Sequence, residues 1–155
     1  MVDDDVFLDP KVWQIILNLK HGEFAMAKGA WPFGRVIAIH TADFKQIGGF
    51  NETYTHVAED HDFYFRALDS KLRFHPIPET LIHHKPHRER YRNIHFALHG
   101  IRNQVQLIMR YWPQHAKFFA SEFLNRLKHG QARTLLLRFL FFYYLLARKM
   151  RKHEP

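Results

Sequence analysis

The sequence contains no cysteine among its 155 residues, which excludes disulfide bonds and thiolate metal sites and fits a reducing compartment. It also lacks the basic start of a secretory signal peptide, because three aspartates occupy positions 3 to 5. Neither an internal repeat nor a low-complexity segment is present. Hydrophobic residues make up 46% of the chain and charged residues 25%, which is the balance of a globular domain with its own core.

Acidic residues are scarce in the second half of the chain. Residues 1–83 hold 8 Lys and Arg against 12 Asp and Glu, a net charge of −4. Residues 84–155 hold 15 against 3, a net charge of +12. This division predicts an acidic front that handles a cation or a substrate, and a basic back that meets an anionic partner such as lipid, nucleic acid or a sugar diphosphate.

Hydrophobic periodicity and turn residues predict an α/β domain followed by a helical tail. Asp9 and Pro10 suit the cap and first position of a helix that ends near Gly22. Two further helices are predicted, from Thr41 to the Gly48-Gly49 pair and over residues 58–70. Strands are expected over residues 24–28, 36–40, 72–77 and 80–83, a loop over residues 29–34, and helices from residue 91 onward, interrupted at Pro113 and Gly130.

Two acidic clusters are candidate sites for chemistry. The first is Asp3-Asp4-Asp5, expected at the end of a strand formed by Met1-Val2, where closely spaced carboxylates suit a hard divalent cation. The second is Glu59-Asp60-His61-Asp62, whose carboxylates suit a general base or a further metal ligand. Taken singly, the first is also typical of a solvated turn and the second of an acidic helix N-terminus.

Histidines, an aromatic loop and a glycine pair are further candidates. His83 and His84 are adjacent, so in a strand they face opposite sides and at most one points into a given metal site. Trp31 belongs to the loop Trp31-Pro32-Phe33-Gly34, where an aromatic face suits a sugar ring and glycine permits close approach of a ligand. Surface histidines, core packing and a helix cap remain open as alternatives.

The order and spacing of these motifs resemble glycosyltransferase family 2. The resemblance rests on Asp3-x-Asp5 followed by Pro10, then Gly48-Gly49-Phe50-Asn51-Glu52, Glu59-Asp60-x-Asp62-Phe63, Arg66, and Pro78-Glu79 with a histidine. It runs from about residue 1 to residue 110. It implies that residues 1–90 are the C-terminal half of a GT-A domain, an α/β sheet that binds a nucleotide-diphosphate sugar, and that residues 91–155 are a basic amphipathic helical extension.

The resemblance implies an inverting transfer from a nucleotide-diphosphate sugar to an acceptor hydroxyl. Asp60, beside Glu59 in the motif, is implied as the general base. Asp5 is implied to bind a divalent cation, Mn²⁺ or Mg²⁺, and Asp3 to lie near the ribose or the donor sugar. One of His83 and His84 is implied to complete the metal site.

The same resemblance implies contacts to donor and acceptor. Gly48 and Gly49 are expected in the floor between the two, Trp31 on the acceptor side, and Asp62 beside the bound substrates. The acceptor class is a polysaccharide or a lipid-linked glycan. The strands and helices that precede the aspartate motif in this family have no counterpart here, so we expect a partial domain with exposed sheet edges and weak or absent catalysis.

The basic tail contains one nearly continuous apolar segment, from Leu135 to Leu146 with Arg138 inside it. This segment is shorter than the roughly 20 apolar residues that span a bilayer. It predicts an interfacial helix on an anionic membrane, or else a helix that packs on the catalytic domain. The resemblance implies synthesis of surface or lipid-linked glycans at the inner leaflet, so the expected location is cytoplasmic and peripheral at the inner membrane.

Other classes of protein compete with this interpretation. A nucleic-acid-binding module would use the basic back half with Tyr91, Tyr111 and Trp112. Aromatic residues at helical spacing and the lack of a nucleic-acid-binding motif argue against it, so no nucleic-acid partner is expected. An inactive fragment and a histidine-based metal store remain, although the 13 histidines show no repeating spacing.

Overall fold

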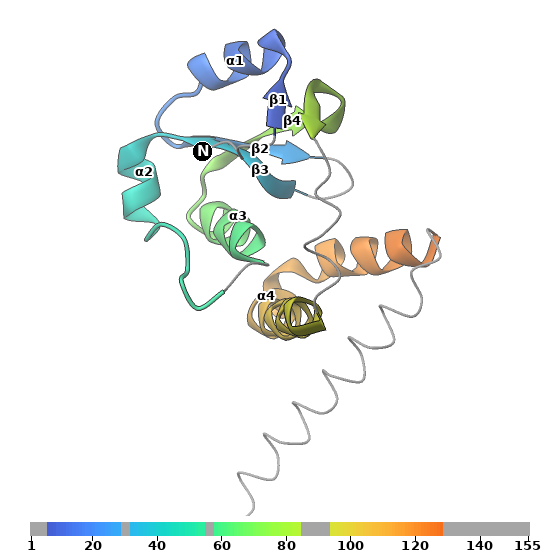
Figure 1. Ribbon diagram of the computed structural model, residues 1–155. Coiled ribbons are helices and arrows are strands. Elements are labelled where there is room, and N and C mark those ends of the chain that lie inside the picture. Colours follow the sequence, from blue (N-terminus) through green and yellow to red (C-terminus); the bar gives the residue numbers. More distant parts are fainter. Residues whose placement is uncertain (1–5, 29–31, 55–57, 85–93, 129–155) are drawn as a thin grey trace, which may run out of the picture. The chain divides into compact units, whose positions relative to one another are not determined.

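The structure, a computed structural model, describes residues 6–28, 32–54, 58–84 and 94–128 (Figure 1). The chain divides into two compact units, Met1–Arg92 and Asn93–Pro155. The described part of the first unit mixes helices and strands, whereas that of the second is helical. The predicted α/β class of the first unit is therefore confirmed.

Three strands form the main sheet of the first unit, in the order β3-β2-β4. The central strand β2 (Glu23–Lys28) pairs antiparallel with β3 (Pro32–Ile39) and parallel with β4 (Arg73–Pro78). The prediction of a loop over residues 29–34 was wrong at its end, because Pro32 and Phe33 already pair with β2. An irregularity in the register between Met26 and Ala27 lets the two strands continue pairing there.

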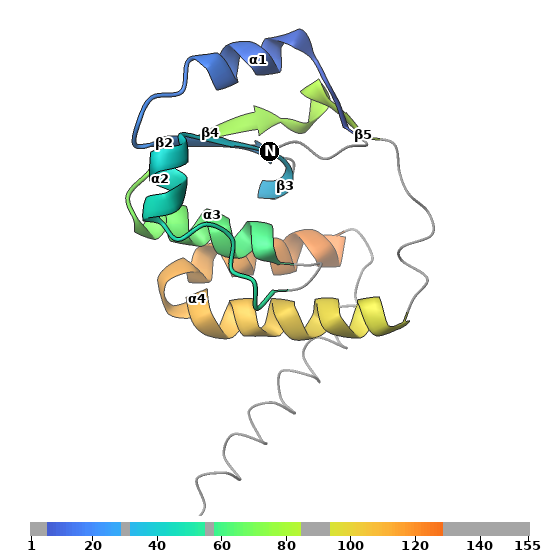
Figure 2. The same ribbon diagram turned by 60° about the vertical axis from the view of Figure 1, so that its left-hand side comes forward.

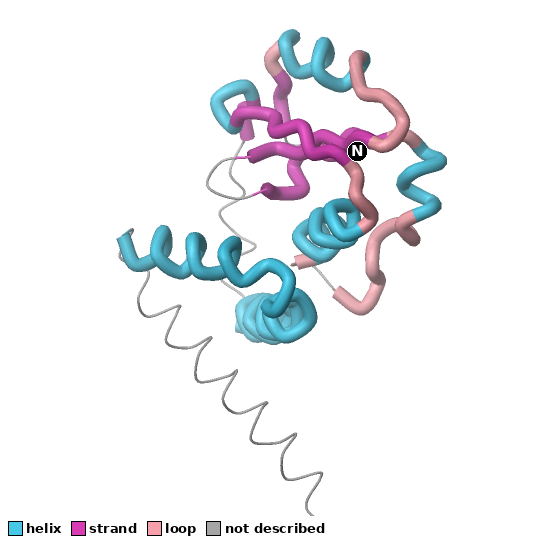
Figure 3. The backbone as a smooth tube through the Cα atoms, turned by 180° about the vertical axis from the view of Figure 1, so that it is seen from behind, coloured by secondary structure: helices cyan, strands magenta, loops and turns pink. Residues whose placement is uncertain are grey.

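Helices cover both faces of this sheet, α1 (Pro10–Leu17) on one and α3 (Glu59–Asp69) on the other, as Figures 2 and 3 show. Side chains alternate along β2, as the period of a strand requires. Ala25 and Ala27 belong to a core cluster with Val12 of α1. Phe24 instead meets Phe63 of α3 edge to face, with ring centroids 6.2 Å apart.

The start of the first helix follows its predicted cap, but its predicted end near Gly22 was wrong. The helix ends at Leu17, where the side chain of Asn18 donates to the carbonyl of Gln14 at 2.8 Å and caps the last turn. Asp9 precedes α1 and accepts a hydrogen bond from the backbone N–H of Lys11 at 2.9 Å, and Pro10 occupies the first helical position. After α2 (Thr41–Gln46) the chain turns through Gly48 and Gly49, with φ of +86° and +65°. Those positive angles explain why two glycines end this helix.

A second, two-stranded sheet pairs a segment near the start of the first unit with a segment near its end. Strand β1 (Val6–Leu8) pairs antiparallel with β5 (Ile82–His84), which follows β4 through a short 3₁₀ turn, η1 (Glu79–Leu81). The strand predicted over residues 80–83 was wrong at its start, since residues 80 and 81 belong to that turn. The strand end predicted at Met1-Val2 lies outside the described residues.

The described part of the second unit is α4 (Ile94–Lys128). The interruption predicted at Pro113 appears as a kink, with non-helical angles at His115 (φ −120°, ψ 28°), because proline cannot complete the helical hydrogen-bond ladder. Gly130 and the segment Leu135–Leu146 lie outside the described residues. Within the described part of the chain, no helix has the length and hydrophobicity that crossing a membrane requires.

Candidate carboxylate site

The N-terminus of α3 presents the second acidic cluster. Ala58 precedes the helix in a left-handed conformation (φ 80°, ψ −3°) and offers no side chain to cap it. Glu59 and Asp60 fill the first turn, where unsatisfied backbone N–H groups and the helix dipole favour negative charge. This explains locally why carboxylates gather there, and it places the predicted catalytic pair on one helical turn.

The Asp60 carboxylate is held by three N–H donors. Its Oδ2 accepts the backbone N–H of Gly34 at 2.7 Å. Its Oδ1 accepts the backbone N–H of His61 at 2.8 Å and lies 2.9 Å from the ring Nδ1 of His61. The Asp60 side chain is 20% exposed, and the three donors fix its carboxylate in place.

Several influences act on the pKa of Asp60. Burial is the largest and raises the pKa, because it disfavours the charged form. The charge and ring N–H of His61 and the backbone N–H groups of Gly34 and His61 lower the pKa, and together they outweigh burial. The pKa of Asp60 therefore lies below its ordinary value, and the carboxylate is ionised at neutral pH.

Gly34 is a glycine because Asp60 approaches it so closely. A Cβ atom built on Gly34 would lie 2.8 Å from Asp60 Cβ and 3.3 Å from Asp60 Oδ2. From the sequence we expected this glycine to permit close approach of a ligand; neither Gly34 nor His61 was predicted as a partner of Asp60. A glycine inside a strand is a signal of close approach, but it does not name the approaching residue.

Asp62, predicted to lie beside the substrates, is fully buried. Its Oδ2 accepts the Nε–H of Arg66 at 2.7 Å, while Arg66 Nη1 and Nη2 donate to the carbonyls of Ile47 and Gly49 at 2.6 Å each. This pair ties α3 to the turn after α2. It thereby holds the predicted substrate floor at Gly48 and Gly49 against the helix that carries Asp60.

Topology brings the candidate residues to one edge of the main sheet. Gly34 lies at the β3 end that pairs with the last residues of β2, so Asp60 sits at the carboxyl ends of the parallel strands β2 and β4. Open α/β sheets bind ligands outside that edge. From the same edge, β4 leads through η1 to β5, and Arg35 Nη1 lies 3.7 Å from Glu79 Oε1 of η1.

The predicted metal ligands are described only in part. Asp3, Asp5 and Trp31 lie outside the described residues, whereas His83 is exposed on β5. The strands place Val6, which directly follows the acidic run, opposite His84, and Phe7 opposite His83. No three potential metal-binding side chains cluster within the described ranges, so the metal site stays a prediction.

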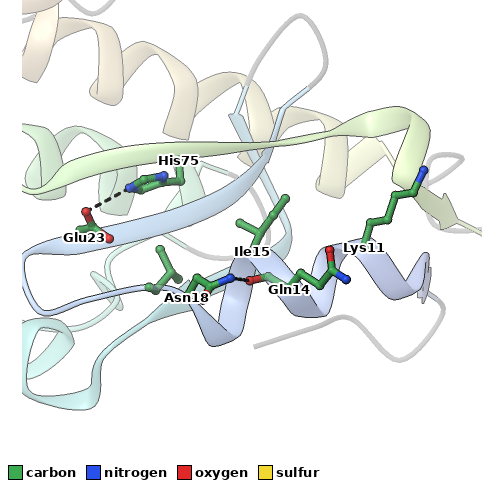
Figure 4. A pocket seen from close by; sticks show the side chains of 7 residues that line it. Lys11, Gln14, Ile15, Asn18, Glu23 and His75 are labelled. Carbon is green, nitrogen blue, oxygen red and sulfur yellow. Dashed lines mark hydrogen bonds and ion pairs between the residues drawn. The ribbon is translucent and has the colours of Figure 1, made fainter.

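A groove of about 450 Å³ lies elsewhere, between α1 and the amino ends of β2 and β4. Figure 4 shows Glu23 and His75 on its wall, with Glu23 Oε1 3.3 Å from His75 Nε2. The carboxylate of Glu23 also accepts the backbone N–H of Lys20, the main cause that lowers the pKa of Glu23. Glu23 and His75 make this contact at the edge opposite Asp60, so the groove is not part of the carboxylate site.

Comparison with known proteins gives one match. Residues 24–95, less than half of the chain, match the family described as the N-terminal domain of galactosyltransferase. No curated protein and no solved structure matches the chain. The matched segment contains Gly34, the Gly48-Gly49 turn and all of α3. It supports a glycosyltransferase in general, with a nucleotide-sugar donor and a glycan acceptor, and it is not specific to family 2.

Proposed function

We propose that this chain transfers a sugar from a nucleotide-diphosphate donor to an acceptor hydroxyl with inversion, with Asp60 as the general base. The observation that carries the proposal is the Asp60 carboxylate, fixed by N–H donors from β3 and α3 at the carboxyl edge of the parallel strands. This carboxylate lies inside the segment that matches the galactosyltransferase family.

To act as the general base, Asp60 must be ionised and must lie beside the acceptor hydroxyl. The acceptor O–H bond breaks as its proton passes to Asp60, and the acceptor oxygen bonds to the anomeric carbon. The bond between that carbon and the diphosphate breaks on the opposite side, and its electron pair leaves with the nucleoside diphosphate. Glu59, in the same helical turn, keeps the edge negative, and Gly48 and Gly49 form the floor between donor and acceptor.

Asp5, Asp3 and one of His83 and His84 would hold a divalent cation, Mn²⁺ or Mg²⁺. The fit rests on the β1–β5 register, which brings the strand that follows the acidic run against the histidine pair. Carboxylate oxygens are the donors that both ions prefer. When bound, the cation would neutralise charge on the departing diphosphate.

We extend the proposal to partners. Trp31 would contribute to the binding of donor and acceptor. Asp62 is fully buried, so it would act only through Arg66, which holds the Gly48-Gly49 turn. The acceptor would be a polysaccharide or lipid-linked glycan. The basic second unit would lie on an anionic membrane surface on the cytoplasmic side. Co-sedimentation with vesicles of anionic lipid, compared with neutral vesicles, tests that last step.

A thermal-shift experiment tests donor binding. The chain is heated with Mn²⁺ alone and with Mn²⁺ plus UDP, GDP, dTDP or CMP. At ten times Kd a ligand adds about 1.4 kcal/mol, which raises Tm by roughly 5–10 °C for a unit of this size. We expect such a rise for one nucleotide only in the presence of the metal, and its loss in Asp5→Ala. A folded sample whose Tm no nucleotide changes would contradict the proposal.

A further inference from the structure

The neighbour of the proposed base, His61, makes two contacts to the same carboxylate oxygen. Its backbone N–H donates to Asp60 Oδ1 at 2.8 Å, and its ring Nδ1 lies 2.9 Å from the same atom. An ionised carboxylate only accepts hydrogen bonds, so the ring must carry a proton on Nδ1. The contact therefore fixes the tautomer of the imidazole.

The two oxygens of Asp60 are thereby made unequal. A carboxylate oxygen accepts about two hydrogen bonds, and both His61 donors fill Oδ1. Within the described ranges, Oδ2 accepts one bond only, from the backbone of Gly34 at 2.7 Å. The next proton to arrive is therefore accepted at Oδ2.

Burial makes this arrangement specific. The side chains of His61 and Asp60 are 19% and 20% exposed, so neither swings freely in solvent. Ala58, the residue before the helix, provides no side-chain cap, so the Asp60 carboxylate is the acceptor that satisfies the His61 backbone N–H. The carboxylate rotamer is thus set from both sides, by the helix and by β3.

We propose that His61 is the positioning residue of the base: its two N–H groups occupy Asp60 Oδ1 and turn Oδ2 toward the acceptor hydroxyl. The inference rests on the proposed function, and it adds which oxygen takes the proton and which side chain selects it. The acceptor O–H bond breaks and an O–H bond forms on Oδ2. The imidazole keeps its own proton on Nδ1 throughout.

The first test needs no substrate. Long-range ¹H–¹⁵N spectra of the labelled full chain, above the pH where histidine is charged, report which ring nitrogen carries the proton. We expect the Nδ1–H tautomer for His61, and loss of that preference in Asp60→Asn. An Nε2–H tautomer for His61 in the wild-type chain would overturn the inference.

The second test measures release of UDP from UDP-galactose with Mn²⁺, with water as the acceptor. We expect His61→Ala to lower kcat about tenfold while KM changes less than about twofold, because misplacing a base affects the chemical step. His61→Asn keeps an N–H donor near the position of Nδ1, and we expect it to recover most of the lost kcat. His21→Ala, a 69% exposed histidine elsewhere, is the matched control and should match wild type.

The outcomes separate this inference from the proposed function. Equal losses in His61→Ala and His61→Asn would mean that the ring itself carries the proton, and wild-type kcat in His61→Ala would mean that it does nothing. Either result overturns the positioning role. Full turnover in Asp60→Asn would instead overturn the proposed function, whatever tautomer His61 adopts.

Discussion

Gly34→Ala is the substitution that probes the carboxylate site most directly. The new methyl carbon would lie 2.8 Å from Asp60 Cβ, 3.3 Å from Oδ2 and 3.5 Å from Cγ. The distance of 2.8 Å is far below a normal contact between two carbon atoms. The new methyl carbon and Asp60 Cβ are both bonded directly to the backbone, so neither can rotate away. Strand β3 and the first turn of α3 must therefore move apart.

The expected loss of stability has two parts. Forcing an extra methyl group into a packed site costs about 1–3 kcal/mol. Separation of the elements also weakens the 2.7 Å bond between Gly34 N–H and the Asp60 carboxylate, and a bond to a charged group contributes about 1.5–3 kcal/mol. Movement of β3 away from α3 relieves the clash but weakens the hydrogen bond, so the two costs do not add in full. We expect a total loss of about 2–4 kcal/mol in the free energy of unfolding.

Urea unfolding followed by circular dichroism, in three backgrounds, identifies the cause. In Asp60→Ala the Cβ remains, so Gly34→Ala should still be destabilising by about 1–3 kcal/mol. In Asp60→Gly the opposing carbon is gone, so the same substitution should cost less than about 0.5 kcal/mol. Equal costs in the Asp60→Ala and Asp60→Gly backgrounds would refute the reasoning, because the clash would then not involve Asp60.

Two more predictions concern the same helix. Arg66→Lys retains the charge but cannot reach Asp62 and the carbonyls of Ile47 and Gly49 together, so we expect a loss of about 3 kcal/mol in urea unfolding. The control Arg73→Lys changes a 75% exposed side chain and should alter stability by less than about 0.5 kcal/mol. Equal losses in the two variants would show that the Arg66 hydrogen bonds do not stabilise the fold. Because the pKa of Asp60 is lowered in the folded chain, its stabilising contribution is present above the unfolded pKa and is lost as pH falls through the folded one. The stability difference between wild type and Asp60→Asn should therefore shrink as pH falls below about 4, and a difference that stays the same there would contradict the assignment.

Local signals in the sequence predicted most of the first unit. Asp9-Pro10 and Gly48-Gly49 act through backbone angles and nearby N–H groups, so the helix ends they predict need no knowledge of the rest of the fold. The strand β1 was not predicted, because three residues are too few to show alternation. Its pairing depends on β5, which lies almost the full length of the unit away.

The candidate site was predictable in its residue types but not in its geometry. The motif was enough to identify the pair Glu59-Asp60 as a candidate. The hydrogen bond between Asp60 and Gly34 was not predictable, because it joins positions 26 residues apart in the sequence. Asp62 looked like a ligand contact because it is acidic and near the pair. Its full burial against Arg66 depends on where the turn after α2 lies, which periodicity does not reveal.

The small β1–β5 sheet has a consequence for the order of folding. Its three residue pairs join the two ends of the first unit, so its formation must close a very long loop for few contacts. We expect the rest of the core between α1 and the main sheet to assemble before that closure, although Ile82 belongs to this core and Leu8 packs against it. We therefore expect β1 and β5 to pair last and to open first in hydrogen exchange. Strand β5, whose pairing with β1 closes this loop, also carries His83 and His84. A ligand that binds the histidine pair only when the strands are paired would therefore favour the closed loop.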